Sequence, residues 1–416
     1  MKTAFLHYSA PPIVGGVESV MHAHAEQFAI SGMQLSIIAG RGNINAMPPG
    51  VDFIQIDEID SMNPEISTAT QDLDNGKIPD SFEKLVNLLS NKLHPVLSEF
   101  DHLIIHNVMT KHFNLPLTVA LFRLMDEGVI KHPIIWSHDL TWSSPNSYTK
   151  VYPAYPWNLL KTFRNDATYV TISEKRRDEV VSTFGCKPED VQIIYNGIDQ
   201  TSLLGLSPES VDLIKRLDLL SADLILLMPV RVTKAKNFEF AIELVSELTK
   251  LNCRPKLIIT GPPDPHDASS MGYYQQLMHL RTQMNVENEV KFVFESGPTT
   301  GENYYIGWQV VSDLYRVADA LLMTSHREGF GMPVLEAGLI GLPIISTPIP
   351  SINELVEHNA LVFSLPTPPH QLADQILSWI RMKPEHNLRV KVRQNYTWES
   401  IFTQNILPLL ETKLDE

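Results

Sequence analysis

The chain has 416 residues, of which 44% are hydrophobic and 19% are charged. A chain of this length and composition is globular and long enough for two domains. Its 33 basic and 48 acidic residues leave a formal net charge of -15, which disfavours non-specific binding to nucleic acid or to anionic lipid.

The cysteines and the apolar runs bear on the compartment. Cys186 and Cys253 lie far apart in the sequence and have no metal-ligand spacing, which indicates a reducing compartment without a disulfide framework. The apolar run after Lys2 is too short for a signal peptide, and no uncharged apolar run reaches membrane-spanning length. We therefore expect a cytoplasmic protein without integral membrane association.

Apolar runs of strand length alternate with segments of helical periodicity, which predicts an α/β fold with parallel sheets. Between the first two predicted strands, apolar residues from Val17 to Phe28 recur at helical spacing and Gly32 supplies a stop, which completes one βαβ unit. The strands predicted in the first half are residues 2–8, 34–39, 102–106, 133–137, 168–172 and 191–195.

A domain boundary is predicted near residue 200. Asn196-Gly197 is a turn dipeptide that closes the first series of strands. Residues 1–200 then form one Rossmann-like domain and residues 201–397 a second, with a helix in 398–416. The strands predicted in the second domain are residues 224–230, 256–260, 290–294, 319–324, 343–346 and 360–363.

The segment from Glu328 to Glu336 places two carboxylates around a Gly-Phe-Gly turn. Pro333 suits the first position of a helix, so the turn leads into a helix N-terminus, whose unpaired N–H groups attract anions. Gly329 and Gly331 allow a ligand to approach the main chain closely. The two glutamates are suited to sugar hydroxyls, so the arrangement fits a phosphate joined to sugars.

This segment resembles the E-x7-E signature of retaining glycosyltransferases with the GT-B fold, most closely glycosyltransferase family 4. Residues 337–346 continue the same pattern. The resemblance implies two Rossmann-like domains whose sheets face each other across a cleft, with residues 1–200 on the acceptor side and residues 201–397 on the donor side. It also implies that the helix in 398–416 packs back on the first domain, and that Gly329, Phe330 and Gly331 contact the donor.

A paired-glycine turn follows the first predicted strand and precedes a helix. Such a turn can present N–H groups to an anion, and it resembles the family's loop over the donor diphosphate, which carries Gly16 over as a donor-binding residue. An ordinary turn with a helix cap explains this loop equally well. It is not the G-x-G-x-x-G fingerprint of a dinucleotide site.

Three cations follow strand 224–230, at the edge of a parallel sheet where ligands bind. A departing diphosphate needs cations or a metal to neutralise its charge. Arg231 and Lys236 match the family's arginine and lysine pair, whereas Lys234 falls at a variable position. A solvated basic turn is the alternative.

His138-Asp139 follows strand 133–137 in the same way. A lone histidine is more often structural, but this pair resembles the family's His-Asp, whose histidine lies beside the transferred sugar. His138 and Glu328 are therefore the catalytic candidates. The remaining histidines, His22 and His24 among them, lack comparable context.

No metal or other cofactor is expected. Asp72-Leu-Asp74 has the D-x-D pattern of the other glycosyltransferase fold, but it lies in the polar stretch 70–76 and is interpreted as a solvated loop. Arg231 and Lys236 can supply the positive charge instead.

A proline-rich loop from Trp142 to Trp157 carries three tyrosines, Tyr148, Tyr152 and Tyr155. It suits either an acceptor-binding edge or a loop packed over its own domain. Residues 296–309 form a longer connection than the family's pattern, so contacts to the nucleotide base are not assigned there.

The resemblance implies a hexosyltransferase that uses a nucleotide-diphosphate sugar, most simply a UDP- or GDP-sugar, and retains the anomeric configuration without a metal. Its acceptor is expected to be a hydroxyl on a soluble metabolite or saccharide. Glu336 would hold the ribose, and Glu328 the sugar hydroxyls. The alternatives are a sugar-nucleotide epimerase of the same fold and a non-catalytic sugar-nucleotide-binding protein.

Overall fold

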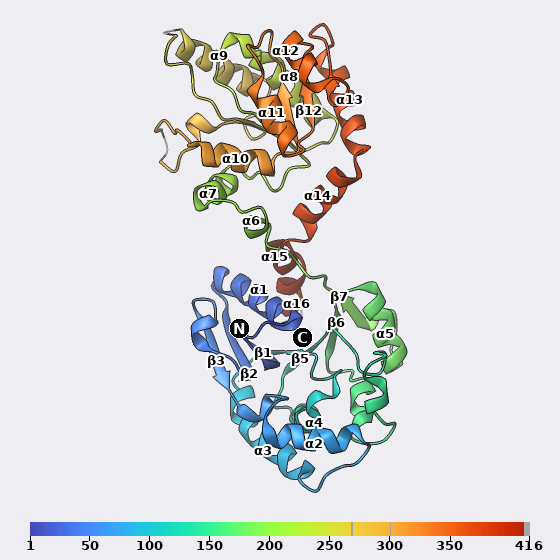
Figure 1. The fold of residues 1–416 in the computed structure, drawn as a ribbon. Helices are drawn as coiled ribbons and strands as arrows, with labels where there is room; N and C mark the ends of the chain where they lie inside the picture. The colour runs from blue at the N-terminus through green and yellow to red at the C-terminus, as the bar shows by residue number, and fades with distance from the viewer. Residues whose placement is uncertain (268, 300, 412–416) are drawn as a thin grey trace. The chain divides into compact units, whose positions relative to one another are not determined.

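The structure is a computed structural model that describes residues 1–267, 269–299 and 301–411 (Figure 1). The chain forms two compact units. The N-terminal unit comprises Met1–Ile198 and the residues that follow Thr397, and the C-terminal unit comprises Asp199–Thr397. Each unit is built on a parallel sheet with helices on both faces, as expected for α/β domains.

The sheet of the N-terminal unit has the strand order β3-β2-β1-β4-β5-β6-β7. The strand order reverses at β1, which pairs with β2 on one side and β4 on the other. The strands are β1 (Lys2–Ser9), β2 (Gln34–Arg41), β3 (Val51–Gln55), β4 (His102–His106), β5 (His132–Ser137), β6 (Thr168–Thr171) and β7 (Val191–Ile193).

The sequence pattern missed β3. This strand lies at the edge of the sheet, and its Asp52 and Gln55 side chains are exposed. A half-exposed edge strand lacks the continuous apolar run that marks the central strands of a parallel sheet. The other strands of this sheet lie where they were predicted, within a few residues.

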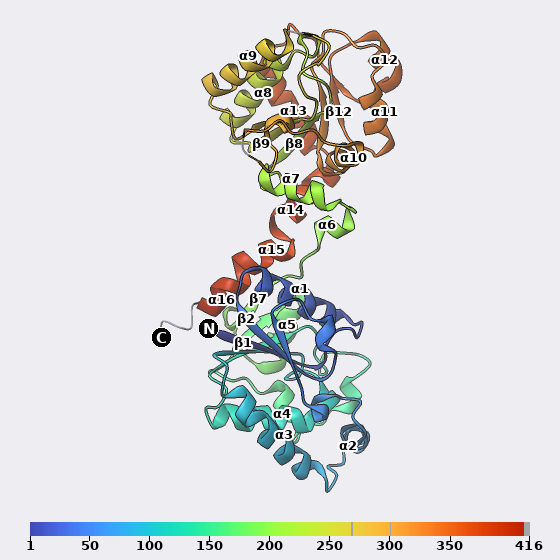
Figure 2. The ribbon, with the colours of Figure 1, turned by 90° about the vertical axis from the view of Figure 1, so that its left-hand side faces the viewer.

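Helices cover both faces of this sheet (Figure 2). In Figure 2, α1 and α16 lie on one face and α3 and α4 on the other. The final helical segment joins the first of these faces, where the Phe402 ring meets Phe28 of α1 with centroids 5.2 Å apart. The helices are α1 (Gly16–Ile30), α2 (Pro64–Asp74), α3 (Phe82–Leu97), α4 (Leu115–Asp126), α5 (Glu174–Phe184), α15 (Trp398–Ile401), a π-helical turn (Phe402–Ile406) and α16 (Leu407–Glu411).

The solvated loop predicted around Asp72-Leu-Asp74 is wrong, because these residues end helix α2. Asn63 caps this helix, and Ile66, Ala69 and Leu73 bury its apolar face. The apolar spacing of α2 begins before residue 70, so the polar stretch 70–76 taken alone does not show the helical pattern.

The turn predicted at Asn196-Gly197 is also not formed, since the chain has no turn there. A Cβ atom at Gly197 would lie 2.7 Å from the backbone nitrogen of Trp398. The glycine is therefore needed for close approach of the final helical segment rather than for a turn.

The sheet of the C-terminal unit has the strand order β10-β9-β8-β11-β12-β13. The order reverses between β8 and β11, which creates a switch point where the loops that follow these two strands diverge. The strands are β8 (Leu224–Met228), β9 (Pro255–Ile259), β10 (Val290–Phe292), β11 (Ala320–Met323), β12 (Ile344–Ser346) and β13 (Leu361–Val362).

The helices of this unit enclose one continuous apolar core around β8 and β11. In Figure 2, α8 and α9 lie on one side of the sheet and α10, α11 and α12 on the other. The helices are α6 (Gln200–Leu203), α7 (Pro208–Arg216), α8 (Phe238–Lys250), α9 (Ser270–Gln283), α10 (Trp308–Val317), α11 (Met332–Leu339), α12 (Pro350–Val356), α13 (Pro369–Arg381) and α14 (Pro384–Asn395).

Candidate functional site

The loops that follow β8 and β11 are joined at the switch point of the C-terminal sheet. The backbone N–H of His326 donates to the carbonyl oxygen of Ala235 at 2.8 Å. The Thr324 hydroxyl donates to the carbonyl oxygen of Lys236 at 2.8 Å. These contacts place the basic loop after β8 directly beside the Glu328 loop.

Lys236 and Glu328 form the central contact of this edge. The Lys236 ammonium donates to both carboxylate oxygens of Glu328, at 2.7 and 2.6 Å. The Ser325 hydroxyl donates to the same carboxylate at 2.6 Å. The Lys236 side chain is 18% exposed and the Glu328 side chain 8%. An ion pair this sheltered from water holds both groups in place, and loss of either partner leaves a buried charge.

Gly331 shapes the turn that leads into helix α11. It is the N-cap residue and has φ +97, a left-handed conformation that favours glycine. No side chain caps α11, so the N–H groups of its first turn have no side-chain acceptor. Pro333 is the second helical residue rather than the first, since the helix begins at Met332.

The other residues of the Gly-Phe-Gly turn face solvent. A Cβ atom at Gly329 would have no neighbour within 4 Å, and the Phe330 side chain is 53% exposed. The start of α11 therefore combines N–H groups that no described side chain caps with open space at Gly329, which suits an anion.

Glu336 lies one turn inside α11 and contacts Tyr315 of α10. The Tyr315 hydroxyl donates to the Glu336 carboxylate. Burial raises the pKa of Tyr315, and the hydrogen bond to Glu336 raises it further. Tyr315 therefore stays a hydrogen-bond donor and fixes one oxygen of the carboxylate, while Glu336 itself is half-buried.

Arg231 lies at the start of the basic loop and is exposed, with its guanidinium 3.8 Å from the Asp264 carboxylate. The sequence reasoning missed the loop that carries Asp264. A Cβ atom at Gly261 would come within 2.3 Å of the Val230 carbonyl oxygen, so this glycine lets the loop after β9 lie against the end of β8. Gly-Pro-Pro immediately after a predicted strand was the available signal.

His138 follows β5 in the N-terminal unit and is 6% exposed. Its backbone N–H donates to the Asn107 side chain at 2.8 Å. Its Nε2 lies 3.1 Å from Nδ1 of His106, and the two rings are stacked. Burial lowers the pKa of His138 to about 3, with His7 and His24 contributing. His138 is therefore a neutral imidazole near pH 7.

His138 belongs to a cluster with His7, His24 and His106 that the sequence reasoning missed. His24, whose sequence context predicts no role, packs on Trp136 with ring centroids 5.1 Å apart. Burial lowers the pKa of His24 to about 3 and that of His106 well below its ordinary value. His7 lies on β1 and His106 on β4, and these two strands pair. Their positions in two predicted strands were the sequence signal that could have indicated the cluster.

The paired-glycine loop at the start of α1 is closed by Glu18. A Cβ atom at Gly15 would lie 2.2 Å from a Glu18 carboxylate oxygen, whereas one at Gly16 would have no neighbour within 4 Å. The Ser9 hydroxyl donates to this carboxylate at 2.5 Å, and Nε2 of His7 lies 3.8 Å from it. Gly16 thus borders open space, but an anion at this helix end would meet the charge of Glu18.

The aromatic loop packs largely over its own domain. The Tyr152 ring lies against Trp157 with centroids 5.0 Å apart, and its hydroxyl donates to the carbonyl oxygen of Asp74. Tyr155 contacts Phe82 of α3. Tyr148 is 55% exposed. The packed-loop interpretation therefore holds for Tyr152 and Tyr155, whereas Tyr148 stays available to a ligand.

Across residues 1–267, 269–299 and 301–411, no group of three or more His, Cys, Asp or Glu side chains is arranged to hold a metal ion. Within the same residues, no helix has the length and apolar character needed to cross a bilayer.

Both units are doubly wound α/β domains with polar side chains at the carboxyl edges of their sheets, which is the class of fold that binds nucleotide-linked ligands. Residues 14–202 match the sequence model of Glycosyltransferase Family 4, and residues 212–397 match that of Glycosyl transferases group 1. The chain belongs to this family of glycosyltransferases, and its two parallel-sheet units confirm the GT-B fold class predicted from the sequence.

Several known proteins are similar to the chain. It is 26% identical over 57% of its length to 58% of an uncharacterized glycosyltransferase of Methanocaldococcus jannaschii. It is 23% identical over 63% of its length to 62% of the mannosylglucosylglycerate synthase of Petrotoga mobilis. The chain thus spans about six tenths of the length of these curated relatives. The structure of Anabaena HepE with UDP and glucose aligns with 99% of the chain and 100% of its own, with 20% identity and a TM-score of 0.36.

Proposed function

We propose that this chain transfers a hexose from a nucleotide-diphosphate sugar to a hydroxyl acceptor, retains the anomeric configuration and uses no metal. The observation that carries the proposal is the Lys236–Glu328 contact at the switch point, next to the uncapped start of α11. A lysine ammonium has three donor hydrogens, and Glu328 occupies two of them. The third is free for a phosphate oxygen.

The donor diphosphate would be held by cations and main-chain N–H groups together. Lys236, Arg231 and the turn from Gly329 to Gly331 supply positive charge and hydrogen-bond donors in one loop pair. These groups stabilise charge that grows on the diphosphate as its bond to the sugar breaks, so their effect is greatest in the transition state. Glu336, with one oxygen fixed by Tyr315, would accept from the ribose hydroxyls.

Glu328 of the C-terminal unit is proposed to bind a hydroxyl of the transferred sugar, and His138 is the catalytic candidate of the N-terminal unit. Glu328 accepts from Lys236 and Ser325 and keeps lone pairs for a sugar hydroxyl. His138 is neutral, so it can donate or accept one hydrogen bond to the sugar without bringing charge. In the proposed step, the acceptor oxygen bonds to the anomeric carbon as the bond between that carbon and the diphosphate oxygen breaks. The acceptor proton passes to the departing diphosphate on the same face.

The acceptor is proposed to be a soluble metabolite or saccharide. The name of the Petrotoga relative, mannosylglucosylglycerate synthase, describes an enzyme that makes a small glycoside. Residues 1–200 would carry the acceptor side and residues 201–397 the donor side. We do not favour an epimerase or a binding protein, because the relatives named above are transferases or synthases by name.

The test is a screen of UDP-, GDP- and ADP-sugars with a panel of sugar and polyol acceptors. We expect one donor class to release nucleoside diphosphate faster when a matching acceptor is present, with a glycoside as product. An epimerase would convert the donor sugar without an acceptor. Release of nucleotide that is unaffected by every acceptor, with no new glycoside, would contradict the transferase proposal.

A further inference from the structure

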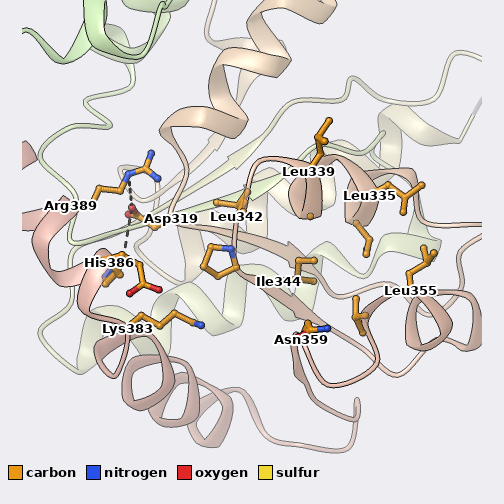
Figure 3. Close-up of a pocket in the computed structure, with 16 residues that line it drawn as sticks. Asp319, Leu335, Leu339, Leu342, Ile344, Leu355, Asn359, Lys383, His386 and Arg389 are labelled. Carbon is orange, nitrogen blue, oxygen red and sulfur yellow. Dashed lines mark ion pairs between the residues drawn. The ribbon is translucent and has the colours of Figure 1, made fainter.

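A cavity of about 720 Å³ lies in the C-terminal unit (Figure 3). Asp319, which precedes β11, and Pro343, which precedes β12, both line it. It therefore lies at the amino ends of these strands, whereas Lys236 and Glu328 lie beyond the carboxyl ends. Its volume is in the range of small-molecule pockets, roughly 300–1,000 Å³.

One side of the cavity is apolar. Figure 3 shows Leu335 and Leu339 of α11 and Leu355 of α12 on this side, with Leu342 and Ile344 between them and the charged side. The Leu339 side chain is 89% exposed. Side chains of this size exposed together beside a cavity mark a surface that binds apolar groups.

The other side is charged and carries an excess of cations. Arg393 donates to both carboxylate oxygens of Asp319 at 3.0 Å, so this buried carboxylate is already paired. Arg389 adds a second guanidinium, with its Nε 3.7 Å from Asp319. Lys383 lies over the Trp379 ring at 4.4 Å, and no carboxylate of the described residues lies within 4.0 Å of its ammonium.

The remaining charged residues at this wall do not cancel the excess. Burial lowers the pKa of His386 despite Asp319, so His386 is neutral near pH 7. Glu385 lines the cavity from an exposed position. Arg393 is buried and does not line the cavity, but it pairs with Asp319, which leaves Lys383 and Arg389 against Glu385 among the charged residues of the lining.

A strained backbone borders the same cavity. Glu357 has φ 47 and ψ -104, a conformation that side-chain-bearing residues rarely adopt. It lies between Val356 and Asn359, which both line the cavity. Backbone strain of this kind is concentrated at ligand sites, where surrounding structure enforces it.

We propose that this cavity binds an amphiphile with a single alkyl chain and an anionic head, either a carboxylate or a phosphate monoester. The alkyl chain of the ligand would lie on Leu335, Leu339 and Leu355, and its anionic head would pair with Lys383 and Arg389. Arg231, Lys236 and Glu328 do not line the cavity, so ligand binding there can be measured apart from sugar transfer, although Val334 and Leu335 of the lining belong to the helix that also carries Glu336.

The test is calorimetric titration of the full chain with dodecyl phosphate and dodecanoate below their micelle concentrations. We expect both to bind, and Lys383→Gln to weaken binding about tenfold, because a charge-assisted contact is lost. Lys391→Gln is the matched control, since Lys391 lies on α14, the helix that Lys383 precedes, but faces the Tyr396 ring and does not line the cavity. Leu339→Glu should weaken binding while leaving the fold intact, because Leu339 is exposed.

Two further probes separate the head from the chain. Dodecyl maltoside lacks the charge and inorganic phosphate lacks the chain, so we expect neither to bind measurably. Equal binding of either one, or equal effects of Lys383→Gln and Lys391→Gln, would overturn the proposal. So would binding to phosphatidic acid vesicles without binding of the monomeric amphiphiles, because that result assigns the contact to a lipid surface rather than to the cavity.

Discussion

The catalytic candidates at the carboxyl edges of the two sheets have different electrostatic surroundings. In the C-terminal unit the edge holds permanent charges, with Lys236 and Glu328 locked together at 2.6 Å. In the N-terminal unit it holds imidazoles whose charge is suppressed by burial, such as His138 and His106. Charged groups suit a diphosphate whose charge grows during reaction, whereas neutral hydrogen-bonding groups suit a sugar. The same type of fold thus provides two different environments.

The largest effect is expected when the carboxylate of Glu328 at the C-terminal edge is replaced by a neutral group of the same shape. Glu328→Gln should lower turnover by about 10²- to 10³-fold, the range for loss of one preorganised polar group in a transition state. Glutamine keeps an acceptor for Lys236, so nucleoside diphosphate affinity should change little. The measurements are kcat with the cognate donor and calorimetric affinity for the diphosphate.

The same variant also tests the stereochemistry. Of the carboxylates described at this edge, Glu328 and Glu336 are assigned to hydroxyls and Asp264 lies beside Arg231, which is assigned to the diphosphate, so none is assigned to a covalent route on the opposite face. Same-face attack is therefore expected, and proton NMR of the anomeric centre should show retention. An inverted product would refute the mechanism, and unchanged turnover of Glu328→Gln would remove the residue from it.

A somewhat smaller effect is expected from Lys236→Met. It removes one charge-assisted contact, worth about 1.5–3 kcal/mol, and should weaken diphosphate binding roughly 10- to 150-fold. It also leaves Glu328 buried without its partner, so the variant should unfold at lower temperature. Arg231→Ala should weaken diphosphate binding without this loss of stability, since Arg231 is exposed and its guanidinium comes no closer than 3.8 Å to the Asp264 carboxylate.

Lys234→Met is the matched control, because Lys234 lies in the same loop but is exposed and makes no ion pair among the described residues. We expect it to behave like the parent chain. If Lys236→Met and Lys234→Met weaken diphosphate binding equally, the loop acts as a diffuse basic patch and the specific role of Lys236 is wrong.

The neutral edge can be tested through pH. The pKa of His24 and that of His138 are each lowered by burial to about 3 in the folded chain, whereas an unfolded histidine titrates near 6.5. The unfolded state therefore binds more protons between these values, and stability is present above pH 6.5 and lost as pH falls towards 3. Each such histidine contributes at most about 1.4 kcal/mol per pH unit.

His24→Leu should flatten this pH dependence, because His24 is buried and its Nε2 has no hydrogen-bond partner. The measurement is urea unfolding followed by tryptophan fluorescence at pH values from 7 to 4. His22→Leu is the control, since His22 lies on the same helix but is partly exposed and pairs with Glu26. Equal slopes for His24→Leu and the parent chain would contradict the account.

The sequence predicted the charged edge better than the neutral one, for a physical reason. Arg231, Lys236 and Glu328 lie in two loops after apolar strands, and Glu336 lies in the helix that follows the second loop, so local patterns suffice to find them. The histidine cluster is assembled from β1, α1, β4 and β5, and its members gain significance only when the sheet brings them together. The ion pair between Lys236 and Glu328, 92 residues apart, was likewise not predictable from spacing.

The smallest effect is expected from metal removal, and it completes the comparison. If the fixed cations of the C-terminal edge neutralise the departing diphosphate, a metal ion has no charge left to balance there. Transfer should then proceed at an unchanged rate in EDTA. Magnesium should not restore the activity of Lys236→Met. A divalent ion would need carboxylate ligands, and the Glu328 carboxylate is buried beside Ser325. Activity that stops in EDTA and returns with magnesium or manganese would show that the charged edge is incomplete without a metal.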